Sequence, residues 1–373
     1  MRKVVVLGVG MTDFGRFPEI PFPKIGADAI IDALQNAGLE WKDILIMYCA
    51  NTANGGCVGE LVEAEIGHTG IPVINVDNAC AGGQTTFLMA YQAVAGGTYD
   101  IALAIGVEQM PRGPLAGLQP TPENLMGIEN MVSKYAMKMQ RAIYEHRYTL
   151  NQMALVSVKN HKNGCYNPHS QYKLALTLED VHNSRMISDP LTLYHCCPTG
   201  DGAATAILCT EEIARKHATP PFITVAGGAL RSQTFVRGEA NESRLISVNT
   251  ANEAYEIAGI GPEDLDMVEL HDNFTISELE HIVDLGLCEE DEVGRLMEEG
   301  AFDLTGRIPV SMSGGLLAKG HPTSATGVAQ ICELVWQMRG QAGQRQGKDP
   351  KVSLSHCCGG NFGMVCGVNI LKK

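Results

Sequence analysis

Short apolar runs rich in β-branched residues recur along the first part of the chain, and helical patterns separate them. The residues that predict buried strands are 4–9, 44–48, 73–76 and 101–107. Residues 25–37 have the amphipathic spacing of a helix that ends before Gly38. Residues 85–95 are apolar on nearly every side and predict a helix buried on more than one face. This alternation predicts parallel strands joined by crossover helices.

The pattern changes between about residues 118 and 195. Residues 119–195 accumulate proline, asparagine and methionine, and they contain eight Lys or Arg against six Asp or Glu. This segment therefore carries +2 in a chain of net charge −14, which leaves −16 for the remainder. The positive charge of this segment has two interpretations of equal weight. The segment could hold a phosphorylated ligand, or it could be a solvated helical segment with ordinary surface lysines.

A second strand and helix series follows the insertion. Strands are predicted at residues 201–210, 222–226, 267–270, 352–355 and 364–370, and helices at 249–257, 277–284 and 326–338. Both halves thus combine strands, glycine-rich turns and buried helices, which makes an ancient duplication plausible.

Length, composition and charge exclude several classes of protein. A chain of 373 residues exceeds the usual size of one hydrophobic core, so we expect two closely packed domains. The net charge of −14 argues against a nucleic-acid or anionic-membrane binder, and no segment has the length of a membrane span. The apolar run at 4–9 is too short and too glycine-rich for a signal peptide. Twelve cysteines without a C-x-x-C spacing predict free thiols in a reducing cytoplasm.

Cys80 lies at a predicted junction between a strand and a helix, in the sequence NACAGG. The positive end of a helix favours a thiolate over a thiol, which would make Cys80 a nucleophile. The alternative is a core cysteine, because free cysteine is among the most buried residue types.

Three further stretches place polar groups beside strand ends or glycine-rich turns. They are MVELHDNFT with His271, Asp272 and Asn273, SGGLLAKGHPTSATG with His321, and SLSHCCGGNFG with Cys357 and Cys358 ahead of Gly359 and Gly360. Ligands collect at the carboxyl ends of strands in open α/β sheets, so these loops can converge with Cys80. Each stretch alone is weak, because a lone histidine is usually structural and two glycines usually form a turn. Together they supply the nucleophile, base and oxyanion donors of acyl transfer through a cysteine. No G-x-S-x-G elbow occurs, and the paired ligand spacings of a zinc site are absent, so we expect no metal.

These motifs, in this order, resemble the thiolase family. The segments that carry the resemblance are NACAGG at 78–83, DGAA at 201–204, HDNF at 271–274, GGLLAKGHP at 314–322 and CCGGN at 357–361. The HDNF segment and the weakly basic central loop resemble the sterol-carrier-protein-type, or lipid-transfer-type, branch. The resemblance covers essentially the whole chain and implies a five-layered αβαβα fold of the α/β class. Its two similar halves would be residues 1–118 with 196–225, and 226–373, with residues 119–195 as an inserted loop domain.

The resemblance also implies roles for particular residues. Cys80 matches the acylated nucleophile, His321 matches the histidine that activates it, and His271 matches a histidine that helps hold a catalytic water, with Asn273 beside it. Cys357 matches the acid and base of the C-x-G segment, and Gly359 matches the second oxyanion hole together with the Cys80 N–H group. Coenzyme A would be a substrate, with no covalently bound cofactor. Candidate contacts to CoA in the inserted domain are Lys134, Lys138 and Arg141.

One departure from the branch concerns the second thiol. Members commonly carry cysteine at the third position of H-D-C-F and lack the cysteine of the C-terminal glycine loop, whereas this chain has Asn273 and Cys357. Because successive strand residues face opposite sides, only one of Cys357 and Cys358 should enter the site, and we favour Cys357.

The expected activity is thiolytic cleavage of a 3-ketoacyl-CoA through an acylated Cys80. Alternatives are biosynthetic condensation of the acetoacetyl-CoA type, a retro-aldol lyase, whose members lack the nucleophilic cysteine, and a non-catalytic acyl-CoA-binding subunit. The inserted segment contains a methionine-rich set: Met126, Met131, Tyr135, Met137 and Met139. This set could form a pocket for a bulky, branched or aromatic acyl group such as that of benzoylsuccinyl-CoA, or it could be ordinary packing. The resemblance further implies a homodimer and a small, separately encoded partner with an OB-fold and a zinc ribbon.

Overall fold

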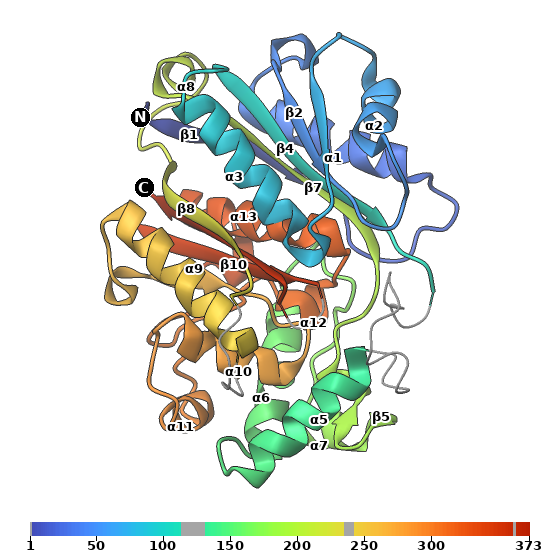
Figure 1. Cartoon of the computed structure of the whole chain (residues 1–373), viewed down its shortest axis with the longest axis vertical. Coiled ribbons are helices and arrows are strands. Elements are labelled where there is room, and N and C mark those ends of the chain that lie inside the picture. The colour runs from blue at the N-terminus through green and yellow to red at the C-terminus, as the bar shows by residue number, and fades with distance from the viewer. Residues whose placement is uncertain (1, 113–130, 235–241, 361–362) are drawn as a thin grey trace.

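The computed structural model describes residues 2–112, 131–234, 242–360 and 363–373 (Figure 1). Nine strands of this part of the chain form one sheet in the order β3-β2-β4-β7-β1-β8-β11-β10-β9. Their bounds are β1 Val4–Met11, β2 Met47–Ala50, β3 Val73–Val76, β4 Ile101–Gln109, β7 Asp201–Thr210, β8 Thr224–Ser232, β9 Met267–Glu269, β10 Val352–Gly359 and β11 Val365–Lys372. Strands β5 (Met186–Ser188) and β6 (Leu191–Thr192) form a separate antiparallel ribbon.

The large sheet consists of two half-sheets with the same topology. They meet at β1 and β8, which pair antiparallel through Val5 and Thr224. From this junction outward, β1-β7-β4-β2 and β8-β11-β10-β9 each contain two antiparallel pairs followed by one parallel pair. Strand β3 adds a further parallel strand to the first half. The expectation of two similar halves is therefore confirmed.

The sequence-based expectation of a parallel sheet was wrong, because β7 and β11 run antiparallel to both of their neighbours. The connection from β10 to β11 spans only residues 360–364. A connection of this length permits a hairpin but no crossover to a parallel strand. Strand alternation with helices thus predicted the α/β class correctly but not the strand directions.

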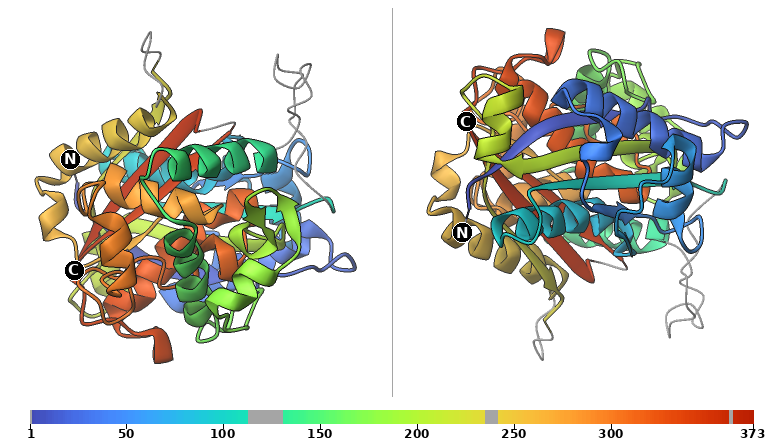
Figure 2. Two further views of the ribbon diagram at one scale, coloured as in Figure 1. Left: turned by 90° about the horizontal axis from the view of Figure 1, so that it is seen from below. Right: turned by 90° about the horizontal axis from the view of Figure 1, so that it is seen from above.

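Helices cover both half-sheets and also fill the space between them, as the right-hand view of Figure 2 shows. Along β1, Val5 and Leu7 pack with α1 (Phe22–Ala37) and α2 (Val58–Ile66), whereas Val4 and Val6 face α3 (Gly82–Ala95) and α13 (Thr323–Arg339). In the second half, Leu354 and Val368 pack with α9 (Glu242–Ala258) and α10 (Thr275–Asp284). The order is helix, sheet, helix, sheet, helix, which is the expected five-layered arrangement.

The segment between β4 and β7 packs against the second half of the chain, although it is inserted in the first. It contains α5 (Met131–Tyr144), α6 (Leu150–Gly164) and α7 (Leu178–Asn183). Met139 and Met153 share a hydrophobic core with Phe274 and Leu279 of the second half. Figure 1 shows these helices at the end of the molecule opposite β2 and α2. The remaining helices are α8 (Glu211–His217), α11 (Val293–Glu298) and α12 (Gly315–Lys319).

Several elements extend beyond their apolar runs. Strand β8 was predicted to end at residue 226 but reaches Ser232, because Gly227 and Gly228 interrupt the apolar pattern without interrupting the pairing. A Cβ at Gly228 would lie 2.4 Å from Asn369 Oδ1, so close packing of the strands explains this glycine. Strand β2 instead begins later than predicted, at Met47 rather than at residue 44.

No helix among the described residues is long and apolar enough to span a membrane.

Candidate active site

Cys80 lies in a short 3-10 turn, Ala79–Ala81, between β3 and α3. Its side chain is buried, and α3 begins two residues later at Gly82. His321 occupies the corresponding place in the second half, two residues before α13 begins at Thr323. A Cβ at Gly83 would lie 2.7 Å from Val328 N, so the two helices pack with their backbones nearly in contact. This close packing brings the starts of both helices, and with them Cys80 and His321, to one point.

The Cys80 thiol contacts the His321 imidazole directly. Cys80 Sγ lies 3.3 Å from His321 Nε2, and His321 Nδ1 lies 2.7 Å from Thr326 Oγ1. The Thr326 hydroxyl donates its proton to the Pro322 carbonyl at 3.0 Å, so it accepts the proton of Nδ1–H. This leaves the Nε2 lone pair directed at the thiol, which is the arrangement of a nucleophile and its base.

Burial keeps this pair uncharged in the absence of substrate. Burial, with a smaller contribution from the Glu108 carboxylate, raises the pKa of Cys80 to about 12. Burial, with a smaller contribution from the Lys319 ammonium, lowers the pKa of His321 to about 3. Burial thus opposes the preference for a thiolate that the start of a helix offers to Cys80. The thiol must therefore transfer its proton as substrate reacts.

His271 follows β9 and completes a compact group with Cys80 and His321. The three side chains offer atoms that all lie within 4.8 Å of one another. The His271 and His321 rings meet edge to face, with centroids 5.5 Å apart. Burial and the neighbouring histidines lower the pKa of His271, so the ring is neutral. Its buried Nε2 has no hydrogen-bond partner among the described residues.

A narrow pocket opens between Cys80 and α5. Its cavity volume is about 20 Å³, which is enough for a water molecule. His271 and Asn273 line it from the end of β9. The Asn273 Nδ2 group donates to the Tyr135 hydroxyl at 3.2 Å, and its Oδ1 accepts from Ser277 Oγ at 2.9 Å. Asn273 therefore lines the pocket in a fixed orientation beside His271.

Asp272, between these two residues, joins two of the sequence motifs. Its Oδ1 accepts from Leu316 N at 2.8 Å, and its Oδ2 accepts from Asn160 Nδ2 at 2.7 Å. A fully buried Lys159–Glu278 ion pair of 2.9 Å lies beside this contact. These bonds hold the HDNF segment against the segment that ends in His321.

Cys357 lies against the backbone of Cys80. Its fully buried Sγ is 3.0 Å from the Cys80 carbonyl oxygen. A Cβ at Gly359 would lie 2.4 Å from Asn78 O and 3.1 Å from Cys80 N, so only glycine fits between β10 and the Cys80 turn. The structure thus brings both sequence-predicted residues to the nucleophile.

Cys358 faces the opposite side of β10, as strand alternation predicts. Its Sγ lies 3.3 Å from both His356 Nε2 and Ser247 Oγ. Contact with the Cys366 thiol lowers the pKa of Cys358, burial opposes this, and the His356 imidazole lowers it further. Cys358 also lines the pocket that contains Cys80. The thiol on the pocket wall is therefore Cys358, which the sequence analysis did not favour, whereas Cys357 contacts the Cys80 backbone.

The three candidate CoA contacts on α5 lie in different environments. Lys138 lines the pocket, and Lys134 is buried. Arg141 is exposed and forms an ion pair with Glu145. Of the methionine-rich set, Met131 and Tyr135 line the pocket, Met139 is in the core, Met137 is exposed, and Met126 is outside the described residues.

The sequence analysis did not predict three residues of the site. Thr326 orients His321, and Arg244 of α9 lines the pocket. The buried carboxylate of Glu108 accepts hydrogen bonds from Thr323 Oγ1 at 2.7 Å and from Ala53 N at 2.8 Å, which ties the end of β4 to the start of α13. An acid at the end of an otherwise apolar strand was the available indication for Glu108.

Comparison with known proteins agrees with this geometry. The model for the N-terminal domain of thiolase matches residues 4–212, and the thiolase C-terminal domain-like model matches residues 239–373. The chain belongs to the thiolase family. This thiolase is an acyltransferase, and CoA thioesters are its substrates.

Two curated relatives align along nearly the whole thiolase. Acetyl-CoA acetyltransferase of Methanothermobacter thermautotrophicus is 38% identical and aligns over 100% of both chains. Benzoylsuccinyl-CoA thiolase subunit BbsB of Thauera aromatica is 37% identical over 96% of this chain and 95% of its own.

Solved structures confirm the fold. The Ltp2-ChsH2(DUF35) aldolase matches with a TM-score of 0.86 at 23% identity, over 99% of this chain and 97% of that chain. Human mitochondrial 3-ketoacyl-CoA thiolase matches with a TM-score of 0.75 at 16% identity, over 100% and 99%. At these identities the similarity concerns the fold alone.

Proposed function

We propose that this thiolase cleaves a 3-ketoacyl-CoA with CoA through an acyl-Cys80 intermediate. The observation that carries the proposal is the 3.3 Å contact between Cys80 Sγ and His321 Nε2, with Nδ1–H held by Thr326. A thiol, an imidazole of fixed tautomer and a second thiol that contacts the backbone of the Cys80 turn are the parts that acyl transfer requires.

In the first half-reaction, the Cys80 proton passes to His321 Nε2 as the sulfur attacks the ketone carbon. The bond between the ketone carbon and the adjacent α-carbon then breaks, and its electron pair forms the enolate of the leaving thioester. His321, with a water held by His271, stabilises the enolate oxygen. Cys357 donates the proton that converts the enolate into a free thioester.

In the second half-reaction, the Cys357 thiolate takes the thiol proton of an incoming CoA. The CoA sulfur attacks the acyl carbon, the bond to Cys80 breaks, and the Cys80 thiolate regains its proton from His321. The N–H groups of Cys80 and Gly359 are the proposed donors to the oxyanion of this step. Run in reverse, the same groups perform a Claisen condensation.

For the acyl group we favour a bulky, branched or aromatic one, with benzoylsuccinyl-CoA as the specific candidate. Met131 and Tyr135 on the pocket wall support it, because methionine adapts to irregular ligands and an aromatic ring stacks on another. The relative named benzoylsuccinyl-CoA thiolase subunit points the same way. Synthesis of acetoacetyl-CoA is the second candidate, which the relative named acetyl-CoA acetyltransferase supports.

The alternatives within the same fold predict no acylated Cys80. A retro-aldol lyase and a non-catalytic acyl-CoA-binding subunit need neither Cys80 nor its contact with His321. Cytoplasmic location, a homodimer and a small partner subunit are part of our proposal. The solved aldolase whose name joins Ltp2 to a DUF35 protein supports the search for such a partner.

The decisive experiment compares the wild type with Cys80→Ala and the matched control Cys49→Ala, which also removes a buried thiol. Purified protein is incubated with benzoylsuccinyl-CoA, 3-ketohexanoyl-CoA or acetoacetyl-CoA, with and without CoA and any copurifying partner. We expect thiolysis and an acyl adduct on the wild type and on Cys49→Ala, and neither on Cys80→Ala. Near-normal thiolysis by Cys80→Ala would refute the nucleophile assignment.

A further inference from the structure

Two cationic side chains lie on the wall of the pocket beside Cys80. Lys138 of α5 and Arg244 of α9 line it together with His271, Asn273 and Tyr135, and Met131 is the large aliphatic side chain among the described lining residues. None of the described lining residues is an Asp or a Glu.

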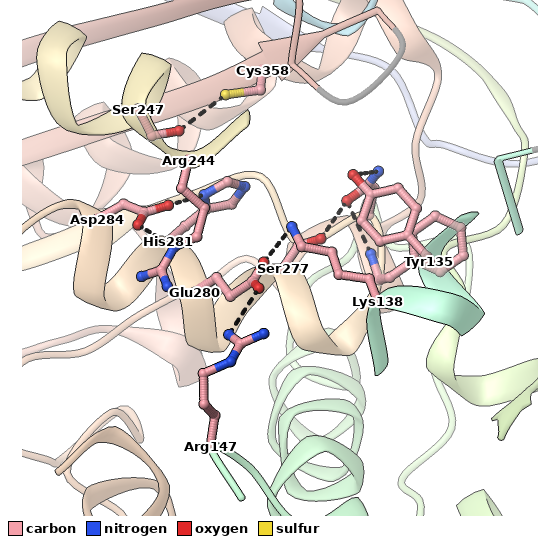
Figure 3. Close-up of polar contacts among 12 residues, drawn as sticks. Tyr135, Lys138, Arg147, Arg244, Ser247, Ser277, Glu280, His281, Asp284 and Cys358 are labelled. Atoms are coloured by element: carbon pink, nitrogen blue, oxygen red, sulfur yellow. Dashed lines mark hydrogen bonds and ion pairs between the residues drawn. The ribbon is translucent and has the colours of Figure 1, made fainter. Parts of the chain in front are cut away.

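Two acids of α10 contact these cations: Glu280 contacts Lys138, and Asp284 contacts Arg244 (Figure 3). Lys138 forms an ion pair with Glu280 of α10, whose side chain is only 1% exposed. Glu280 is shared with Arg147, at 3.4 Å. An ammonium group has three donors, so a single carboxylate oxygen of Glu280 does not exhaust those of Lys138.

Arg244 is held in a similar way. Its Nε donates to Asp284 Oδ1 at 2.7 Å, and its Nη1 donates to Glu290 Oε1 at 2.8 Å. Its Nη2 has no hydrogen-bond partner among the described residues. Asp284 in turn contacts His281 Nδ1 at 3.3 Å. The ion pairs therefore fix the position of both cations while leaving donors for a ligand.

Both groups stay charged. Burial works against the Lys138 ammonium, but Glu280 prevails and raises the pKa of Lys138. Asp284 and Glu280 likewise overcome burial and raise the pKa of Arg244. Cations fixed in a narrow pocket attract an anion there more strongly than mobile surface cations do, because no ordering of the side chains is needed.

We propose that Lys138 and Arg244 bind a free carboxylate of the substrate, close to the carbon that Cys80 attacks. This inference rests on the proposed thiolase function and names the substrate class: 3-ketoacyl-CoA thioesters whose acyl skeleton carries a second carboxyl group. The phosphates of CoA are a poorer match, because the long pantetheine arm separates them from the reacting thioester. Benzoylsuccinyl-CoA belongs to the proposed class, since a succinyl group bound to CoA keeps one free carboxylate.

Two substrate pairs of matched skeleton test the inference on the full chain with any copurifying partner. The first pair is 3-ketoadipoyl-CoA and 3-ketohexanoyl-CoA, and the second is benzoylsuccinyl-CoA and its methyl ester. A charge-assisted hydrogen bond predicts that kcat/KM for the free acid exceeds that for its neutral counterpart by about tenfold to a hundredfold in at least one pair. We expect the difference mainly in KM.

The variants Lys138→Met and Lys138→Arg test whether Lys138 causes the preference for the free acid over its neutral counterpart. Lys138→Met should lower the acid-to-neutral ratio of kcat/KM by about tenfold, and Lys138→Arg should retain most of it. The double variant Lys138→Met/Glu280→Gln removes both charges of the ion pair, and it should show the same loss if Lys138→Met alone does not fold. Lys216→Met, at an exposed lysine of α8, is the control for the change in net charge.

The outcomes separate the inference from the proposed function. Thiolysis of both members of each pair at equal kcat/KM would overturn the carboxylate site and leave the thiolase proposal standing. An acid-to-neutral ratio that is unchanged in Lys138→Met would also overturn it. Absence of thiolysis for all four substrates would instead count against the proposed function.

Discussion

The hydrogen bond between His321 Nδ1 and Thr326 Oγ1 allows a sharp test of the proposed base. At 2.7 Å, this bond assigns the proton to Nδ1 and the lone pair to Nε2, which faces Cys80. The substitution Thr326→Val keeps the shape of the side chain but removes the acceptor. The imidazole can then place its proton on Nε2, where it cannot accept the proton of Cys80.

The expected magnitude follows from the burial of this contact. Loss of one hydrogen-bond partner of a buried polar group costs about 1–3 kcal/mol, which corresponds to about tenfold to a hundredfold in rate when the bond acts in the transition state. Thr326→Ser retains the hydroxyl and should recover most of the activity. Thr250→Val is the matched control, because Thr250 is also a buried helical threonine whose hydroxyl donates to the carbonyl four residues before it, at 2.6 Å.

Two assays separate a catalytic loss from a structural one. The first is kcat for thiolysis, and the second is the rate at which iodoacetamide alkylates Cys80 as a function of pH. Thr326→Val should lower both while its urea midpoint stays within the range of Thr250→Val. If Thr326→Val alkylates and turns over like the wild type, then His321 is not the base that activates Cys80.

Three further predictions concern the remainder of the site. Cys357→Ala should permit acylation of Cys80 while slowing carbon–carbon bond cleavage, whereas Cys358→Ala should retain that step; the reverse result would assign the acid and base to Cys358. Gly359→Ala should lower both kcat and stability, the latter by about 1–3 kcal/mol, because its Cβ would meet Asn78 O at 2.4 Å. Gly56→Ala, which has open space, is the control, and equal urea midpoints would contradict the clash. Acid should destabilise the fold. Burial lowers the pKa values of three histidines to about 3 or 4, namely His161, His195 and His321. As the pH falls, these histidines are protonated in the unfolded chain before they are protonated in the folded one. The free energy of unfolding, from urea titrations, should fall by about 2 kcal/mol per histidine between about pH 7 and about pH 5, and a flat profile would contradict their burial as neutral rings.

Much of the site could be predicted from the sequence because its residues lie in short, glycine-rich motifs. Cys80, His321 and Gly359 each stand beside the start of a helix or the end of a strand, where the local pattern is distinctive. Arg244 could not be found in this way. It lies in an ordinary helix, α9, and only the packing of α9 against α10 places it on the wall of the pocket that α5 also lines.

The pattern of apolar and polar positions by itself determined the α/β class, the repeated strand and helix order, and the motifs that carry the chemistry. These features depend on periodicity and on residue type, which are local properties of the chain. The tertiary structure decided the mixed strand directions, the position of the inserted helices over the second half, and the neutral state of Cys80 and His321. Strand direction depends on which segments pair across the sheet, and the charge of a buried group depends on how much water its neighbours displace, so both arise only when distant segments pack together.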